Sequence, residues 1–363
     1  MTTSLRWYPD SQSTLAHLNH LREARGRGAA ADYRRLRICA LRKVESAMSY
    51  FDLGHPDGTP LLCLHGLSVT GLYFNQFHDY FVARRIRAIA PCLLGGVSIA
   101  DSSKTVGHLS TELIELLDAL GIDRFDVVGF SWGTLPLLAL LAAVPARIRR
   151  AGLLGPMLPT RFLDSAEVGR MKSDVRTSLA MVRHLPAVHR WVMALVGRLP
   201  ASVLVNQFRD ANLSMAEAQA LAAGAPFTQH LSHCIDECRR SGSQFFTHGW
   251  RMFLEEPGYA LSDLASPALR ANLHLYVGER DNVHLPSFAK AIAAARSGID
   301  VAELERRSEQ ALPGHDARAG PYRQIFSTAH CGIWMAPGAG RLACILYLKD
   351  AVEHLLSSPG PQS

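Results

Sequence analysis

The chain has 363 residues, of which 48% are hydrophobic and 19% are charged, a balance typical of a well-packed globular protein and not of a disordered chain. The formal net charge is +6, but no long block of Lys and Arg occurs, and the densest basic cluster, Tyr33–Arg37, also contains apolar residues. A solvated strand or helix face explains this cluster better than a nucleic-acid contact, so we expect no nucleic-acid partner.

The sequence contains no recognisable targeting segment. Its first residues, MTTSLRWYPD, lack a basic stretch followed by an apolar one, so we expect no secretory signal. The longest apolar run, Leu135–Val144, includes Pro136 and is much shorter than the ~20 residues that a membrane-spanning helix needs. The seven cysteines are odd in number and scattered, which is typical of reduced thiols. These features predict a cytoplasmic protein without a membrane span.

In chain order, residues 1–35 form an N-terminal extension in which a polar, helical pattern is followed by a Gly- and Ala-rich linker. Such an extension can dock on the body of the protein or form contacts in a homodimer. From Leu36 onward, short apolar runs alternate with helical patterns. We expect strands at 37–44, 47–52, 60–64, 86–90, 125–128, 151–154, 273–277 and 324–327. Apolar strands separated by helices predict an α/β fold with a mostly parallel sheet that helices cover on both sides.

The alternation of strands and helices is interrupted twice. Residues 159–267 contain no clear buried strand, and their helical periodicity predicts a helical cap inserted between two strands. A shorter charged insertion, residues 297–320, is expected to form a loop. The predicted core therefore has two parts, 36–158 and 268–357, and a Ser-Pro-Gly tail follows at 358–363.

The stretch Val127–Thr134, VVGFSWGT, places Ser131 between two glycines, after a predicted strand and before an apolar helix. Gly129 and Gly133 allow the strand to turn sharply into the helix, and such a turn holds the central side chain exposed in a strained conformation. A hydroxyl group held in this way can act as a nucleophile.

A serine hydroxyl is a weak nucleophile at neutral pH unless a base removes its proton and a third group orients that base. Two predicted strands downstream are followed by suitable residues, Asp281 after the run 273–277 and His330 after the run 324–327. The carboxyl ends of parallel strands meet at one edge of a sheet. We therefore expect Ser131, Asp281 and His330 to meet there, with Glu279 as the alternative acid.

This order of nucleophile, acid and histidine, together with the His65-Gly66 dipeptide after an earlier strand, resembles the α/β-hydrolase superfamily over roughly residues 36–355. The resemblance implies an α/β-hydrolase fold with a helical cap. It also implies a catalytic triad of Ser131, Asp281 and His330, and it requires neither a cofactor nor a metal ion.

The same resemblance implies an oxyanion hole made by the backbone N–H groups of Leu67 and Trp132, whereas His65 is interpreted as a structural residue that holds its loop. An Asp in place of Ser131 would have indicated a dehalogenase or an epoxide hydrolase. One departure from the family pattern is Cys92, which stands where many relatives carry an Asp after the fourth strand.

The resemblance predicts cleavage of an acyl ester, a thioester or a related carbonyl substrate, and the apolar cap favours a small hydrophobic acyl substrate. Acyl transfer and cleavage of a carbon–carbon bond would use the same three residues, and a low-turnover ligand receptor shares the fold, so these alternatives stay open. His230, Cys234 and Cys238 stand at helical spacing, which favours packing over a metal site.

Overall fold

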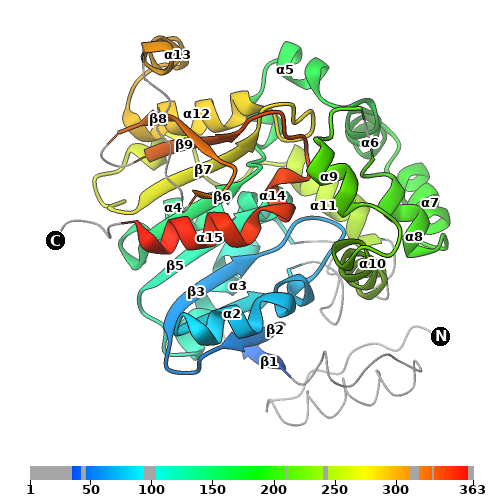
Figure 1. Ribbon diagram of the computed structural model, residues 1–363, viewed down its shortest axis with the longest axis horizontal. Helices are drawn as coiled ribbons and strands as arrows, with labels where there is room; N and C mark the ends of the chain where they lie inside the picture. Colours follow the sequence, from blue (N-terminus) through cyan, green and yellow to red (C-terminus); the bar gives the residue numbers. More distant parts are fainter. Residues whose placement is uncertain are drawn as a thin grey trace.

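The computed structural model describes residues 35–41, 46–93, 104–209, 211–239, 244–310, 319–328 and 331–358. Within these ranges a nine-stranded sheet lies between two layers of helices (Figure 1). Apart from Arg35, the predicted N-terminal extension lies outside the described residues, and so does the predicted tail apart from Ser358.

The sheet is mostly parallel. Its strands are β1 (Leu36–Leu41), β2 (Ser46–Gly54), β3 (Thr59–Leu64), β4 (Ile86–Pro91), β5 (Phe125–Phe130), β6 (Ile148–Leu154), β7 (Asn272–Gly278), β8 (Arg323–Ser327) and β9 (Cys331–Ala336). They are ordered β1-β2-β4-β3-β5-β6-β7-β9-β8. Strands β4, β3, β5, β6, β7 and β9 pair in parallel, whereas β1 with β2, β2 with β4, and β8 with β9 pair antiparallel. The predicted mostly parallel α/β sheet is therefore confirmed.

Helices bury both faces of this sheet. One layer contains α3 (Val106–Ala119), α4 (Thr134–Ala143) and α12 (Pro286–Ser297), and the other contains α2 (His78–Ala83), α14 (Ala343–Leu346) and α15 (Leu348–Ser357). Alternate residues of β3 belong to different cores, because Leu62 and Leu64 pack in the first layer and Leu61 and Cys63 in the second. This two-sided burial explains why the strand is almost entirely apolar.

The last two strands differ from the sequence-based expectation. The predicted strand 324–327 is present as β8, but β8 pairs antiparallel with β9, a strand that was not predicted. Because β9 runs parallel to β7, the end of β8 and the start of β9 lie at the edge where the parallel strands begin. The β9 sequence, CGIWMA, begins with a small thiol residue and a glycine directly after a polar stretch, which concealed its strand character.

The insertion 297–320 was expected to be a loop, and this expectation is wrong for part of it, because α13 (Val301–Gln310) is a helix. Leu304 is fully buried in the core beneath this helix. Glu303 accepts a hydrogen bond from Arg307 at 2.6 Å, a pairing one helical turn apart that supports the helix. Residues 311–318 lie outside the described residues.

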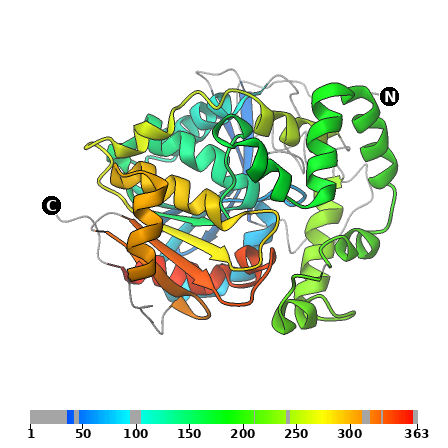
Figure 2. The same ribbon diagram turned by 90° about the horizontal axis from the view of Figure 1, so that it is seen from above.

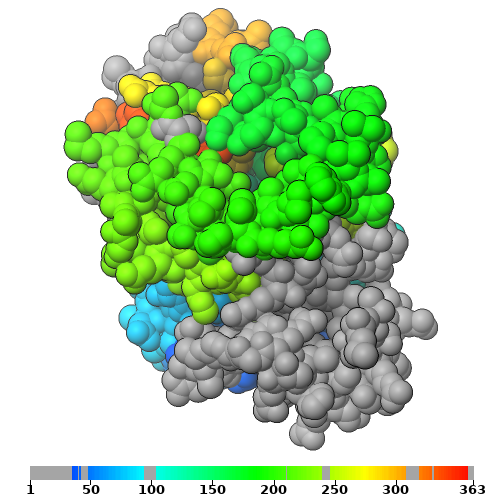
Figure 3. All heavy atoms as spheres, turned by 90° about the vertical axis from the view of Figure 1, so that its right-hand side faces the viewer, coloured from blue at the N-terminus to red at the C-terminus, as the bar shows by residue number. Residues whose placement is uncertain are grey.

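Between β6 and β7 the described chain contains further helices, which we call the α5–α11 segment. They are α5 (Ser165–Arg170), α6 (Ser173–His184), α7 (Pro186–Val196), α8 (Ala201–Asn206), α9 (Met215–Ala220), α10 (Pro226–Arg239) and α11 (Gln244–Leu254). Figure 2 shows this segment, mainly green, packed against one end of the sheet, and in Figure 3 it covers much of one face of the molecule. In the loop after β5, the indole Nε1 atom of Trp132 donates to the carbonyl oxygen of Gly249 in α11 at 2.9 Å. The α5–α11 segment therefore lies at the carboxyl edge of the sheet.

The seven cysteines are all free thiols. None of the helices in the described ranges combines the length and the apolar composition that crossing a bilayer requires. The predicted boundaries of the cap and of the two core parts stay predictions.

Candidate active site

Ser131 follows the last residue of β5 and begins a single helical turn that leads into α4. Its φ angle of 52° lies in the left-handed region, which residues other than glycine rarely adopt. A Cβ atom at Gly133 would lie 2.5 Å from the carbonyl oxygen of Leu64, and one at Gly129 would lie 2.9 Å from the carbonyl oxygen of Gly133. Both predicted glycines are therefore required, because a side chain at either position would clash with nearby backbone atoms. Together they allow the strained turn at Ser131, which we call the elbow.

Buried hydrogen bonds hold this turn in place. Thr134 Oγ1 donates to the carbonyl oxygen of Ser131 at 2.6 Å and accepts the backbone N–H of Met157 at 2.9 Å. Thr134 is fully buried, so these bonds are protected from water. They tie the elbow to the chain that follows β6.

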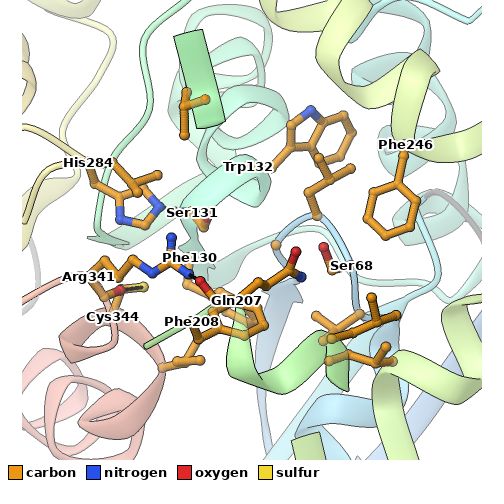
Figure 4. A pocket seen from close by; sticks show the side chains of 18 of the residues that line it. Ser68, Phe130, Ser131, Trp132, Gln207, Phe208, Phe246, His284, Arg341 and Cys344 are labelled. Atoms are coloured by element: carbon orange, nitrogen blue, oxygen red, sulfur yellow. Dashed lines mark hydrogen bonds between the residues drawn. The ribbon is translucent and has the colours of Figure 1, made fainter. Parts of the chain in front are cut away.

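His284 lies directly beside the serine. Its Nε2 atom is 2.8 Å from Ser131 Oγ, and its Nδ1 atom is 2.7 Å from Asp281 Oδ2 (Figure 4 shows the ring and the serine). Asp281 Oδ1 accepts the backbone N–H groups of Val283 and His284, each at 2.8 Å. A carboxylate can only accept, so Nδ1 carries a proton and Nε2 is free to accept the proton of Ser131. The arrangement therefore has the connectivity of an acid, a base and a nucleophile.

The expectation that His330 contacts Ser131 is corrected by this geometry, since His284 occupies that position. His330 itself lies outside the described residues, but Thr328, directly after β8, and Cys331, the first residue of β9, lie at the opposite edge of the sheet. The physical reason is the direction of β8, which runs antiparallel to its neighbour and so carries its carboxyl end away from Ser131.

The sequence did contain a signal for His284, which stands three residues after Asp281 in the same loop. Asp281 and His284 could have been paired from the sequence, because both lie in one short loop at the carboxyl edge and no further strand is needed to bring them together. The alternative acid, Glu279, is exposed and accepts the backbone N–H of Gly338 at 2.7 Å, so its carboxylate serves the neighbouring turn.

A glycine that sequence reasoning missed makes room for the imidazole. Gly155 follows β6 with a φ angle of 53°, and a Cβ atom there would lie 2.9 Å from Cγ and Nδ1 of His284 and 2.9 Å from Cβ of Cys344. Its backbone N–H donates to the carbonyl oxygen of Tyr276 at 2.7 Å, which fixes the loop against β7. No side chain fits between this backbone and the ring.

The loop after β3 approaches Ser131 from the other side. A Cβ atom at Gly66 would lie only 3.2 Å from Ser131 Cβ. Leu67 and Trp132, the residues expected to form an oxyanion hole, line the same cavity as Ser131. In this loop Ser68 also has a left-handed φ angle, 78°, so the backbone is strained on both sides of the site.

His65 is a structural residue in this geometry, as interpreted from the sequence. Its Nδ1 atom donates to the carbonyl oxygen of Gly66 at 2.8 Å, and its Nε2 atom accepts the backbone N–H of Leu93 at 2.9 Å. Burial lowers the pKa of His65 to about 4, although the bond to Gly66 opposes this shift. The ring therefore stays neutral and links the loops after β3 and β4.

The side chains of Ser131 and His284 open into a cavity of about 300 Å³ between the sheet edge and the α5–α11 segment (Figure 4). We call it the Ser131 cavity. Its walls are predominantly apolar, and those from the α5–α11 segment include Val175, Met193, Val196, Leu204, Phe208, Leu231, Ile235, Phe246 and Trp250. Polar side chains on the walls include Ser68, Asp174, Ser178, Gln207 and Arg341.

Within the described ranges no group of three or more His, Cys, Asp or Glu side chains could hold a metal ion. In the helical pattern of His230, Cys234 and Cys238, the imidazole Nε2 atom lies 3.0 Å from the carbonyl oxygen of Tyr73. Cys234 and Cys238 are fully buried in the core, which agrees with the packing interpretation.

Known proteins share this architecture. A family model described as the alpha/beta hydrolase family matches residues 61–320. Epoxide hydrolase VrEH1 from Vigna radiata is similar in structure with a TM-score of 0.62 and 15% identity, covering 91% of this chain and 98% of that chain. Carboxylesterase CesB from Bacillus subtilis has a TM-score of 0.56 and 13% identity, covering 94% of this chain and 98% of that chain. The esterase RhEst1 from Rhodococcus sp. ECU1013 has a TM-score of 0.56 and 15% identity, covering 88% of this chain and 99% of that chain. No curated protein matches the sequence.

Proposed function

The chain belongs to the alpha/beta hydrolase family, as its sequence predicted, and we propose that it is a serine hydrolase that cleaves an acyl ester, a thioester or a related carbonyl substrate. One observation carries the proposal. The hydroxyl of Ser131 is held at a strained turn, 2.8 Å from an imidazole whose other nitrogen is 2.7 Å from a buried carboxylate. These are the contacts that convert a serine into a nucleophile.

In the proposed mechanism, Ser131 Oγ attacks the substrate carbonyl carbon while His284 Nε2 takes its proton. The protonated imidazole then gives this proton to the leaving group, and an acyl-enzyme remains. Water attacks the acyl-enzyme with His284 again as the base, which releases the acid and restores Ser131. Asp281 keeps the ring in the required tautomer and stabilises its charged form through the 2.7 Å bond.

The tetrahedral intermediate carries negative charge on the former carbonyl oxygen. We propose that the backbone N–H groups of Leu67 and Trp132 bind this oxygen, since both residues line the Ser131 cavity and flank the serine. Loss of one oriented donor of this kind typically lowers the rate by ~10²–10³. None of these steps requires a cofactor.

The substrate is proposed to be a small molecule with a largely hydrophobic body. Support comes from the apolar walls of the cavity and from its volume of about 300 Å³. The α5–α11 segment would act as a cap that excludes water from the acyl-enzyme. The free thiols agree with the proposed cytoplasmic location.

Labelling and turnover together test the proposal. A fluorophosphonate should label the wild-type protein at Ser131 and should not label Ser131→Ala, because the tetrahedral phosphorus resembles the acyl-transfer transition state. Wild-type protein should also hydrolyse p-nitrophenyl esters of medium chain length over many cycles. A single stoichiometric burst with every ester tested would contradict the hydrolase and favour the receptor alternative, and unchanged labelling of Ser131→Ala would remove the serine from the mechanism.

A further inference from the structure

A cluster of large apolar side chains lies on the outside of the α5–α11 segment. Leu185, directly before α7, and Val188, Trp191 and Leu195 within α7 are all exposed, and Trp191 is the most exposed of the four at 64%. Spacings of three and four residues place them on one face of the helix. We call these four residues the α7 patch. Figure 1 shows α7 at the outer edge of the molecule, on the side of the segment that is turned away from the sheet.

The exposed face of α7 differs from that of an ordinary surface helix, which turns apolar side chains to the core and polar side chains to solvent. The inner face of α7 is already apolar, since Met193 and Val196 line the Ser131 cavity. On the same inner side, His189 is buried and its Nδ1 atom lies 2.8 Å from Thr247 Oγ1 in α11. The helix is therefore apolar toward solvent as well as toward the cavity. A cluster of this kind indicates a contact surface.

The charge of the surrounding sequence indicates the kind of partner. From residue 175 to residue 209 the sequence contains neither Asp nor Glu, but it contains five arginines, Arg176, Arg183, Arg190, Arg198 and Arg209. Arg183, Arg190 and Arg198 are exposed, and none of these three has an ion-pair partner among the described residues. The α7 patch is thus flanked by positive charges that no acid of the same stretch compensates.

These charges disfavour a second copy of the chain as the partner. A symmetric dimer formed through the α7 patch would bring the arginines of both copies together, and like charges in such a contact repel each other. Anionic lipid headgroups attract the same arginines, and the boundary between headgroups and acyl chains accommodates exposed apolar side chains. Tryptophan is enriched at this boundary, because its ring is apolar and its N–H group is polar.

We propose that the α7 patch and its flanking arginines dock the protein on the surface of a bilayer that contains anionic lipids. In this arrangement α7 lies in the plane of the headgroups and does not cross the bilayer. Because another face of α7 lines the Ser131 cavity, docking brings the cavity to within about one helix diameter, ~10 Å, of the lipid. The inference goes beyond the proposed hydrolase function and does not depend on it.

Vesicle flotation with the full-length protein tests the proposal. The partition coefficient is measured on vesicles of phosphatidylcholine alone and on vesicles of two parts phosphatidylcholine to one part phosphatidylglycerol. The variants Trp191→Ser, Val188→Ser and Arg190→Gln change the docking surface. Two matched controls repeat the substitutions elsewhere. Val301→Ser changes a valine of α13 that is 39% exposed, compared with 45% for Val188, and Arg270→Gln changes an exposed arginine before β7.

Wild type should bind the anionic vesicles at least about tenfold more strongly than the neutral vesicles, and added salt should weaken this binding. On anionic vesicles the partition coefficient should fall about tenfold in Trp191→Ser, about threefold in Val188→Ser and about fivefold in Arg190→Gln. Both control variants should keep the wild-type value. Circular dichroism checks that each variant is folded.

Lack of binding by the wild-type protein would overturn the proposal, and so would equal binding by Val188→Ser and Val301→Ser. If a second copy covers the patch instead, sedimentation velocity will show a dimer that Trp191→Ser dissociates, without vesicle binding. Loss of binding in Arg190→Gln but not in Trp191→Ser would also overturn it, since charge alone would then hold the protein. The substituted side chains do not line the cavity, so ester turnover should be retained in every variant. Failure of docking is therefore distinguishable from failure of the hydrolase.

Discussion

The Nε2 atom of His284 lies 2.8 Å from the Oγ atom of Ser131, although the two residues are 153 positions apart in the chain. The acid that orients this histidine, Asp281, is only three residues away from it in the same loop. Because Asp281 Oδ1 also accepts the N–H groups of Val283 and His284, one compact turn fixes both the carboxylate and the imidazole. The candidate base and acid are thus positioned by a single element at the end of β7.

Replacement of the histidine that contacts the serine should abolish activity. We expect His284→Ala to lower kcat/KM for a p-nitrophenyl ester by about 10³-fold or more, since Ser131 loses the group that removes its proton. His330→Ala should keep activity near the wild-type level. Steady-state kinetics and fluorophosphonate labelling measure both effects, and circular dichroism checks that each variant is folded. Loss of activity in His330→Ala with full activity in His284→Ala would contradict the geometry.

The acid can be distinguished from its neighbour by a pair of amide substitutions. Asp281→Asn removes the negative charge and favours the wrong tautomer of His284, so we expect kcat to fall by about 10⁴-fold, as with the corresponding change in a serine protease. Glu279→Gln should change kcat by less than about threefold, because Glu279 is exposed and accepts only from the Gly338 turn in the bonds described. If the two variants ranked in the reverse order, the acid would have to be reassigned.

The strands and the strained turn at Ser131 could be predicted because their signals are local. Apolar runs bounded by turn residues marked eight of the nine strands, and Gly129 and Gly133 marked the elbow within five residues of sequence. The family resemblance added the expected place for an acid after the strand that became β7.

The histidine that contacts Ser131 could not be predicted in the same way, because the sequence of a short strand does not show whether it pairs parallel or antiparallel with its neighbours. The run 324–327 reads alike in a parallel and an antiparallel strand, and only pairing with the unpredicted β9 shows that it turns away from Ser131. Gly155 depends on contacts with distant segments. Its role therefore became visible only when the chain after β6 was placed beside the loop that carries His284.

Gly155 offers a test of how closely the imidazole is packed. In Gly155→Ala the new methyl group would lie 2.9 Å from two ring atoms of His284, so we expect kcat/KM to fall at least about tenfold as the ring is displaced. The left-handed φ angle of 53° should also lower the free energy of unfolding by about 1–2 kcal/mol.

A matched control separates these two effects. Gly298 has a φ angle of 65°, and no atom lies within 4 Å of the position that a Cβ atom would take there, so Gly298→Ala introduces similar backbone strain away from the site. It should lose about 1 kcal/mol of stability and keep wild-type kcat/KM. Urea unfolding and ester hydrolysis give both quantities. Equal activity in the two variants would show that the imidazole does not need the space at Gly155.

Stability should fall in mild acid because two histidines remain neutral in the folded protein. Burial lowers the pKa of His65 to about 4 and that of His274 to about 3, and the charges of His354 and Arg150 add to the second shift. In the unfolded chain both groups titrate near 6.5, so between about pH 6.5 and these lower values the unfolded state binds more protons than the folded state. The free energy of unfolding should therefore decrease as the pH falls through this interval, by about 1 kcal/mol per pH unit for each histidine.

His274 allows this linkage to be tested away from the candidate active site. Its ring stacks on Tyr276 in β7, with ring centres 6.4 Å apart, and an aromatic replacement preserves that packing. In His274→Phe one of the two groups no longer titrates, so the decline in stability between pH 6.5 and pH 5 should be shallower than in wild type by about 1 kcal/mol per pH unit. Urea unfolding at several pH values measures the slopes. Identical slopes in the two proteins would show that His274 titrates with the same pKa in the folded and unfolded states, and a steeper slope in the variant would reverse the sign of its contribution.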